Sequence, residues 1–195
     1  MQACVLIARL DRQRMRKVNS VSKQRWYNIA FSLIALSVVL ADQFSKAWVR
    51  SNIALGQSMP EGAFFHLTHS QNTGAAFGIF QGHTFSLTVV SFIGVGIILA
   101  YTFYLCRRFP FLNNMVSKSA LGVMLGGTIG NLIDRISLGY VTDFIGVGTF
   151  PTFNVSDASI TGGVGVFAGS LIYLLVKEKQ EMVNSDDLGC HRLED

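Results

Sequence analysis

The chain has 195 residues, of which half are hydrophobic and only 14% are charged. Soluble domains carry about 25% charged residues, so this deficit, together with a mean hydropathy of +0.39, excludes an ordinary soluble protein and predicts a membrane protein. The net charge of +4 would by itself allow a nucleic-acid partner, but the distribution of the basic residues argues against one.

Four segments are long enough, or nearly so, to cross the hydrocarbon core of a bilayer, which needs roughly 20 apolar residues. They are Trp26–Ala41, Phe85–Leu105, Ser119–Ile133 and Ala158–Val176. The first ends at Asp42, and the third lies between Lys118 and Asp134. We therefore predict an all-α membrane protein, a four-transmembrane-helix bundle built from residues 25–177. Residues 1–24 are expected to form a cytoplasmic N-terminal extension, and residues 178–195 a cytoplasmic tail.

The positions of Lys and Arg predict the orientation, because these residues concentrate in cytoplasmic segments. Seven of the 16 basic residues precede the first span, three lie between the second and third spans, and three follow the fourth. The two other links hold only Lys46, Arg50 and Arg135. Both termini are thus expected in the cytoplasm, with residues 42–84 and 134–157 on the outer face. The basic residues are a topology signal, and no nucleic-acid partner is expected.

The first span has a competing interpretation as a cleaved signal peptide. A basic start, an apolar stretch and the residues VLA before Asp42 fit that pattern. Cleavage would leave three spans and an outer N-terminus. The motif DQFSK that follows directly favours a retained helix.

Glycine spacing in the later spans predicts close packing of helices. Gly122, Gly126 and Gly130 recur every four residues in the third span, and Gly165 and Gly169 repeat this spacing in the fourth. In lipid, small residues at this spacing let helix backbones approach closely. We interpret these glycines as packing features of a tight bundle.

Polar residues gather at the predicted outer ends of the spans. The set consists of Asp42, Lys46, Asn72, Asn131, Asp134, Arg135, Asp143, Asn154 and Asp157. Each has an ordinary explanation alone, such as an i,i+4 ion pair between Asp42 and Lys46 or a helix cap at Asn154. Ionisable groups at membrane depth are costly, however, so the set as a whole predicts a functional site.

Asp143 and Asp157 suggest the chemistry of that site. They lie 14 positions apart in YVTDFIGVGTFPTFNVSDASI. Two neighbouring carboxyls share one proton, so one can accept a proton from water while the other polarises a carbonyl, without metal or cofactor. Phe144, Phe150 and Phe153 are expected to exclude water. Asp157, near a helix start, is expected to be ionised, and Asp143 to hold the proton.

Other chemistries fit less well. The outer links contain no cysteine and no GxSxG motif, and a Ser–Lys pair using Lys46 has no evident serine. His66 and His69, in HLTH, have a spacing compatible with a metal, but an alternating strand is the commoner reason for it. Two other classes stay open: a small cation or proton transporter that uses the outer Asp/Asn cluster, and a structural scaffold.

Five motifs together resemble a known family. They are DQFSK (42–46), QNTGAAFGIF (71–80), GGTIGNLIDR (126–135), GYVTDF (139–144) and FNVSDASI (153–160). In order and location they resemble bacterial lipoprotein signal peptidase, also called signal peptidase II. The resemblance implies an aspartyl endopeptidase of the bacterial cytoplasmic (inner) membrane. Such an enzyme removes the signal peptide from prolipoproteins that carry diacylglycerol, and it cuts just before the lipobox cysteine at the outer face.

The resemblance also implies roles for single residues. Asp143 and Asp157 match the catalytic pair; Asn72, Asn131, Arg135 and Asn154 match positions that contact substrate or inhibitor; Asp42, Lys46 and Asp134 are expected to support them. The first outer link resembles the family's small extracytoplasmic β-cradle, and GAFFHLTHSQN alternates as a strand does. Lipidated prolipoproteins, membrane lipids and a globomycin-type inhibitor are the implied partners. Ser156 stands where the family usually has Ala, and the link between the two acids is short.

Overall fold

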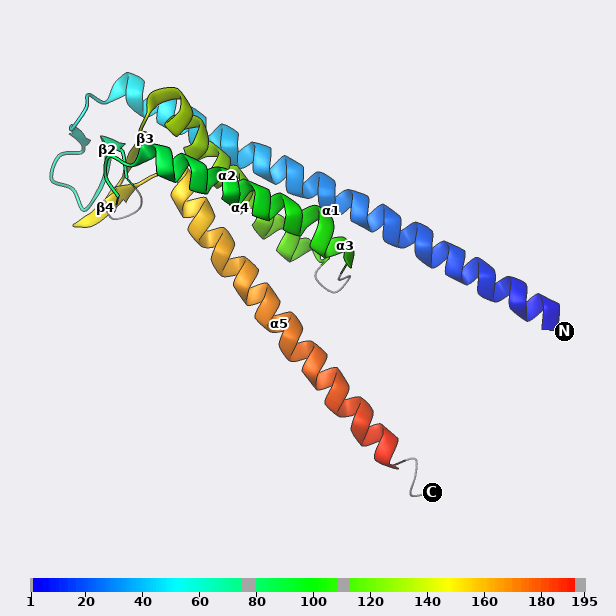
Figure 1. Ribbon diagram of the computed structural model, residues 1–195. Coiled ribbons are helices and arrows are strands. Elements are labelled where there is room, and N and C mark those ends of the chain that lie inside the picture. The colour runs from blue at the N-terminus through cyan, green and yellow to red at the C-terminus, as the bar shows by residue number, and fades with distance from the viewer. Residues whose placement is uncertain (1, 75–79, 109–112, 192–195) are drawn as a thin grey trace.

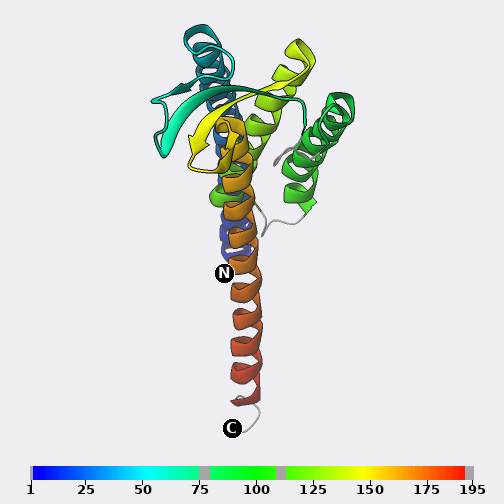
Figure 2. The same cartoon turned by 90° about the vertical axis from the view of Figure 1, so that its left-hand side faces the viewer.

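The helices of the protein run from a small sheet at one end towards the two chain termini at the other (Figures 1 and 2). The computed structural model describes residues 2–74, 80–108 and 113–191. Within them, long helices alternate with the strands of one four-stranded antiparallel sheet. The expectation of a mostly helical protein with a small sheet is confirmed.

Helix α1, Gln2–Asn52, does not end at Asp42, so the predicted boundary of the first span is wrong. Beyond Asp42 one face of the helix is buried, with Lys46 0% and Val49 1% exposed. The carboxylate of Asp42 and the ammonium of Lys46 pair with each other inside the protein. A charge that is paired in the interior does not require the helix to end.

Helix α2, Thr84–Ala100, continues as a π-helical turn η2, Tyr101–Leu105, and the short helix α3, Cys106–Arg108. Helix α4, Met115–Leu138, follows. The side chain of Asn114 caps its start by accepting from the backbone N–H of Ser117. Gly139, with φ of 79°, ends it in the left-handed conformation that suits glycine.

Helix α4 lies at the centre, against both α1 and α5, Val155–His191. The approach to α1 is so close that a Cβ atom on Gly126 would lie 2.6 Å from the carbonyl oxygen of Ala35. The close packing predicted for the glycines of α4 is therefore confirmed. The prediction is wrong for Gly165 and Gly169, because a Cβ atom added at either would meet no other described part of the protein within 4 Å. Gly163, by contrast, lies on the face of α5 that packs against α4.

Three helical stretches of the described chain are long and apolar enough to cross a membrane: Ser22–Asn52, Thr84–Tyr104 and Val155–Gln180. Helix α4, which contains the predicted third span, is not among them. Neighbouring helices cover α4, so that much of its surface is buried against protein. Its glycines and buried polar residues lower its hydropathy for the same reason.

The sheet joins the two links that were predicted to face outward. Strands β1, Ser58–Met59, and β2, Phe65–Asn72, come from the first link; β3, Val141–Val147, and β4, Phe150–Phe153, come from the second. Their order is β1-β2-β3-β4, and neighbours are antiparallel. The first link supplies strands as expected, and residues 141–153, for which no strand was predicted, form a hairpin that supplies the other two strands.

Two apolar clusters hold this arrangement together. One joins α1, α2 and α4 and contains Phe31, Ala35, Ile98, Leu121 and Leu125. The other joins the end of α1 to the sheet through Val49, Ile53 and Phe144. Because Phe144 follows Asp143 in the chain, the second cluster also fixes the strand that carries this acid.

Candidate active site

Asp143 lies in β3 and Asp157 in the first turn of α5, and one residue contacts both. The side-chain Nδ2 of Asn154 donates to Asp143 Oδ1 at 2.7 Å, and its backbone N–H donates to Asp157 Oδ2 at 3.3 Å. The hairpin of β3 and β4 thus returns the chain so that the two acids meet. Asp143 is only 2% exposed.

Asp157 is also part of the N-terminal cap of α5. The side-chain Oδ1 of Asn154 accepts the N–H of Asp157 at 2.9 Å, while Asp157 Oδ2 accepts the N–H of Asn154. Two side chains that accept each other's backbone N–H in this way form a capping box. The start of the helix therefore fixes the position of this carboxylate.

Asn131 points an N–H donor at Asp157, and a lysine sets its orientation. Lys46 Nζ can only donate, and it donates to Asn131 Oδ1 at 2.9 Å. The Nδ2 of the same amide is thereby left to donate to Asp157 Oδ1 at 2.8 Å. Each oxygen of Asp157 thus accepts one N–H.

Asn72 and Asn154 are oriented in the same way: the amide oxygen of each accepts a backbone N–H, and Nδ2 donates to Asp143. Asn72, at the end of β2, accepts the backbone N–H of Gly74 with Oδ1 at 2.8 Å and donates Nδ2 to Asp143 Oδ2 at 2.9 Å. Asn154 uses its Oδ1 for the helix cap and its Nδ2 for Asp143 Oδ1. Both oxygens of Asp143 therefore accept amide N–H groups whose directions are fixed.

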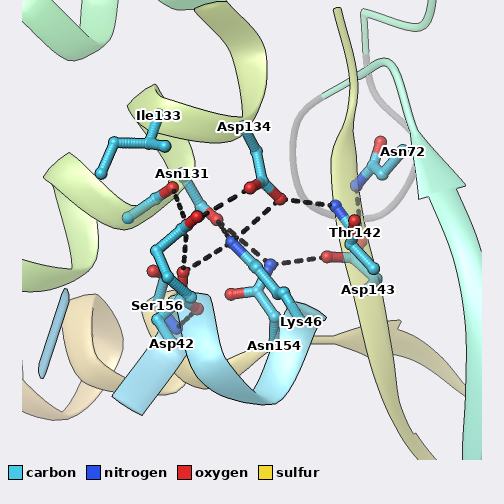
Figure 3. A network of polar contacts seen from close by, with 12 residues as sticks. Asp42, Lys46, Asn72, Asn131, Ile133, Asp134, Thr142, Asp143, Asn154 and Ser156 are labelled. Atoms are coloured by element: carbon cyan, nitrogen blue, oxygen red, sulfur yellow. Dashed lines mark hydrogen bonds and ion pairs between the residues drawn. The ribbon is translucent and has the colours of Figure 1, made fainter. Parts of the chain in front are cut away.

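Lys46 is the centre of a buried charge network (Figure 3). Its ammonium lies 2.8 Å from Asp42 Oδ2, 3.3 Å from Asp134 Oδ2 and 2.9 Å from Asn131 Oδ1. The three N–H donors of an ammonium thus meet three acceptors, as a buried charge requires. The i,i+4 pair of Asp42 and Lys46 is present as expected, and it belongs to a network that reaches Asp157 through Asn131.

Asp42 links the network directly to the start of α5. Its Oδ1 accepts the backbone N–H of Ser156 at 2.9 Å. A Cβ atom on Gly130 would lie 2.3 Å from Ser156 Oγ and 2.5 Å from Asp42 Oδ2. At this point α1, α4 and α5 therefore meet without room for another atom, next to Asp157.

Burial raises the pKa of Asp143 from 3.8 to about 6, and the neighbouring negative charge of Asp157 adds to the increase. The amide hydrogen bonds from Asn72 and Asn154 and the positive charge of Lys46 oppose it. Desolvation disfavours a charged carboxylate, whereas donors to it favour the charge. A carboxyl whose pKa lies near 6 can gain or lose a proton near neutral pH.

Arg135 lies at the border of the site. Its guanidinium makes two long contacts, from Nη1 to Ser91 Oγ and from Nη2 to the Gly74 carbonyl oxygen, both at 3.4 Å. Its charge is close enough to act on Asp143 and Asp157. Arg135 thus connects α4 to α2 and to the loop after Asn72, and residues 75–79 of that motif lie outside the described residues.

Three residues of the network were not singled out from the sequence as site residues. Gln43 Nε2 donates to the Gly130 carbonyl oxygen at 3.0 Å and lies 3.3 Å from Asp134 Oδ1. Arg50 and Thr142 contact each other at 2.9 Å. The i,i+4,i+8 spacing of Asp42, Lys46 and Arg50 would have indicated one helix face, had α1 been extended past Asp42.

Two further expectations concerned the histidines of HLTH and the aromatic residues between the two acids. His66 and His69 lie in β2, where their Nδ1 atoms lie within hydrogen-bond distance of the carbonyl oxygens of Ala63 and Ile53. Among the described residues, no group of three or more His, Cys, Asp or Glu side chains is placed to hold a metal ion. Phe144 is buried, as expected for a residue that excludes water from the site. Phe150, on the edge strand β4, is 54% exposed, so the prediction that it excludes water is wrong.

Comparison with known proteins gives one family throughout. The family profile described as "Signal peptidase (SPase) II" matches residues 34–173. A lipoprotein signal peptidase of Dehalococcoides mccartyi is 53% identical over 138 residues, covering 70% of this chain and 84% of the relative. One of Moorella thermoacetica is 38% identical over 143 residues, covering 73% and 92%.

Solved structures of bacterial membrane enzymes have a similar fold. A bacterial membrane enzyme determined by the in meso method at 2.3 Å resolution has a TM-score of 0.64 and 30% identity, covering 76% of this chain and 88% of the other. The transporter alternative gains no support, because the relatives are lipoprotein signal peptidases. The profile match spans both acids, the three asparagines and the buried lysine, and this chain therefore belongs to the signal peptidase II family.

Proposed function

We propose that this protein is an aspartic endopeptidase that removes the signal peptide from prolipoproteins, with Asp143 and Asp157 as its catalytic pair. The substrate is a prolipoprotein that already carries diacylglycerol, and the cut falls just before its lipobox cysteine. The observation that carries the proposal is Asn154, which donates to both carboxylates. Two carboxyls held together, one buried and the other half-buried, suit the activation of water for attack on a peptide bond.

In this mechanism the ionised acid takes a proton from water and the protonated acid polarises the scissile carbonyl. Each acid accepts two N–H donors, so the helix start decides the assignment. Asp157 is the ionised partner, because it lies in the first turn of α5, where the helix dipole favours negative charge. Asp143 holds the proton, which it then gives to the leaving amine. With a pKa of about 6, Asp143 is protonated in roughly one molecule in ten at pH 7. A bound substrate that excludes water raises that fraction.

The residues around the pair would hold the substrate backbone and the lipid ester. Asn72, Asn131, Arg135 and Asn154 are the substrate-contacting residues in this proposal. The guanidinium of Arg135 has five N–H donors in a rigid fork, which suits carbonyl or phosphate oxygens. Asp42, Lys46 and Asp134 act behind them, because their network fixes Asn131 and the start of α5.

We further infer that residues 25–177 cross the bacterial inner membrane four times, with α4 as the third span. Its 24 residues reach about 36 Å, enough for the hydrocarbon core. The basic residues before α1 and after α5 favour cytoplasmic termini for the segments 1–24 and 178–195. The acids then lie at the outer face, in contact with membrane lipids. A globomycin-type inhibitor would compete with the substrate there.

The experiment compares wild-type enzyme with Asp143→Asn and Asp157→Asn on a diacylated prolipoprotein. Each substitution is expected to slow cleavage by about 10²–10⁴-fold, the usual contribution of acid–base catalysis. Glu61→Gln, at an exposed acid of the first outer link, is the matched control and should cut normally. If both aspartate variants cut as fast as wild type, the pair is not catalytic and a scaffold role is favoured.

A further inference from the structure

Thr142, the residue before Asp143, is held at two atoms. It is 0% exposed. The guanidinium Nη1 of Arg50 donates to its Oγ1 at 2.9 Å, and its own backbone N–H donates to Asp134 Oδ2 at 3.0 Å. The side chain and the backbone of one residue are thus tied to α1 and to α4.

This attachment lies where the sheet gives less support to β3. Strand β4 pairs with β3 at Ile145 and Val147, so its pairing stops before Thr142 is reached. Towards Asp143 the strand keeps β2 on one side. On its other side, the Asp134 carboxylate accepts the backbone N–H of Thr142 in place of a strand partner.

Arg50 is placed to hold both contacts together. It follows Lys46 by one helical turn, so both cations lie on the same face of α1. Its Nη1 lies 3.8 Å from Asp134 Oδ1, while Lys46 lies 3.3 Å from Asp134 Oδ2. Each cation thus contacts one oxygen of Asp134, and Arg50 adds a second positive charge to a group that contains two acids and Lys46.

We propose that Arg50 is a positioning residue of the peptidase, which acts through Thr142 and Asp134 on the strand that presents Asp143. It makes its contacts one residue away from the acid. The inference rests on the proposed function, because it concerns how precisely Asp143 meets its substrate. A misplacement of about 1 Å can slow an enzyme by about 10²-fold, so a small shift of β3 is measurable.

The test measures kcat and KM on a diacylated prolipoprotein for Arg50→Gln, Thr142→Val and the double variant. Valine keeps the shape of threonine and removes only the hydroxyl that accepts from Arg50. Each single variant is expected to lower kcat by about 10-fold with KM within about twofold. The double variant should be no slower than Arg50→Gln, since both remove the same contact. Arg50→Lys keeps the positive charge and N–H donors and should retain part of the rate that Arg50→Gln loses.

Two controls separate positioning from general loss of stability. Arg25→Gln removes an exposed cation from the same helix and should leave kcat unchanged. The apparent pKa in the pH profile of kcat should move in Thr142→Val, because Asp143 shifts against its amide donors, whereas a merely less stable enzyme keeps the profile. Thermal unfolding is recorded for every variant.

The inference is overturned if Thr142→Val matches wild type, or if the effects of the two single substitutions multiply in the double variant. It is also overturned if the lost activity follows Tm alone with an unchanged pH profile. The same assay includes Asp143→Asn as a reference. Full activity in that variant contradicts the proposed function itself, whereas full activity in Thr142→Val contradicts only the role of Arg50.

Discussion

Adding one methyl group at Gly130 is expected to disable the site while leaving most of the fold intact. The new Cβ would lie 2.3 Å from Ser156 Oγ and 2.5 Å from Asp42 Oδ2, whereas ordinary contacts begin near 3.4 Å. Relief therefore requires a movement of about 1 Å at the start of α5, where Asp157 follows Ser156. A displacement of that size costs about 10²-fold in rate.

The loss of stability in Gly130→Ala should be small by comparison. Overpacking costs about 1–3 kcal/mol, and the gain in helix propensity from Gly to Ala returns about 1 kcal/mol. The assay is cleavage of a diacylated prolipoprotein in detergent micelles, with kcat measured beside Tm. Gly162→Ala is the matched control, because the added Cβ would meet no other described segment of the chain within 4 Å.

A Gly130→Ala enzyme that cuts within about twofold of wild type would contradict this prediction, since the tight contact would then not fix Asp157. Equal losses in the Gly130 and Gly162 variants would refute it too, because only Gly130 has the short contacts.

Two further predictions concern stability. The pKa of Asp143 is raised to about 6, so the folded state binds more protons than the unfolded state between about pH 4 and 6. The free energy of unfolding should fall by up to about 3 kcal/mol as pH rises through this window. The difference in Tm between wild type and Asp143→Asn, followed from pH 4 to 8, measures it, and a pH-independent difference contradicts it. Lys46→Met leaves Asp42 and Asp134 buried without their ammonium and should cost about 3–5 kcal/mol. Thermal unfolding beside the exposed control Lys23→Met checks this, and equal Tm values for the two variants would show that the network is not stabilising.

The sequence predicted the meeting of the acids because membrane topology restricts where polar side chains can lie. Asp143, Asn154 and Asp157 occupy one short stretch between two apolar segments, so any outer link brings them near one another. Asn72 and Asn131 were predicted to lie in the same site because they, too, stand at the predicted outer side of the membrane, in other segments of the chain. The individual hydrogen bonds were not predictable, because they depend on side-chain directions that spacing alone does not define.

The errors have a common physical cause, which is burial of residues that usually mark a surface. Asp42 is predicted to end the first span, yet it pairs with Lys46 inside the bundle. Strand β3 shows no alternation because Val141, Thr142, Asp143 and Phe144 are all buried; strands covered on both faces lose the period of two. Arg50 was overlooked as a site residue for the same reason, since its partners Thr142 and Asp134 are interior.

The joining of distant segments also has a consequence for synthesis of the protein. Asn72 and Asp143 are 71 positions apart, and Asp42 and Ser156 are 114 apart. A nascent chain that stops before Asn154 lacks the helix cap, the residue that contacts both acids, and Asp157. No such translation intermediate contains both acids of the proposed catalytic pair. On that proposal, proteolytic competence arises late, when the start of the last helix reaches the strands and helices that precede it in the chain.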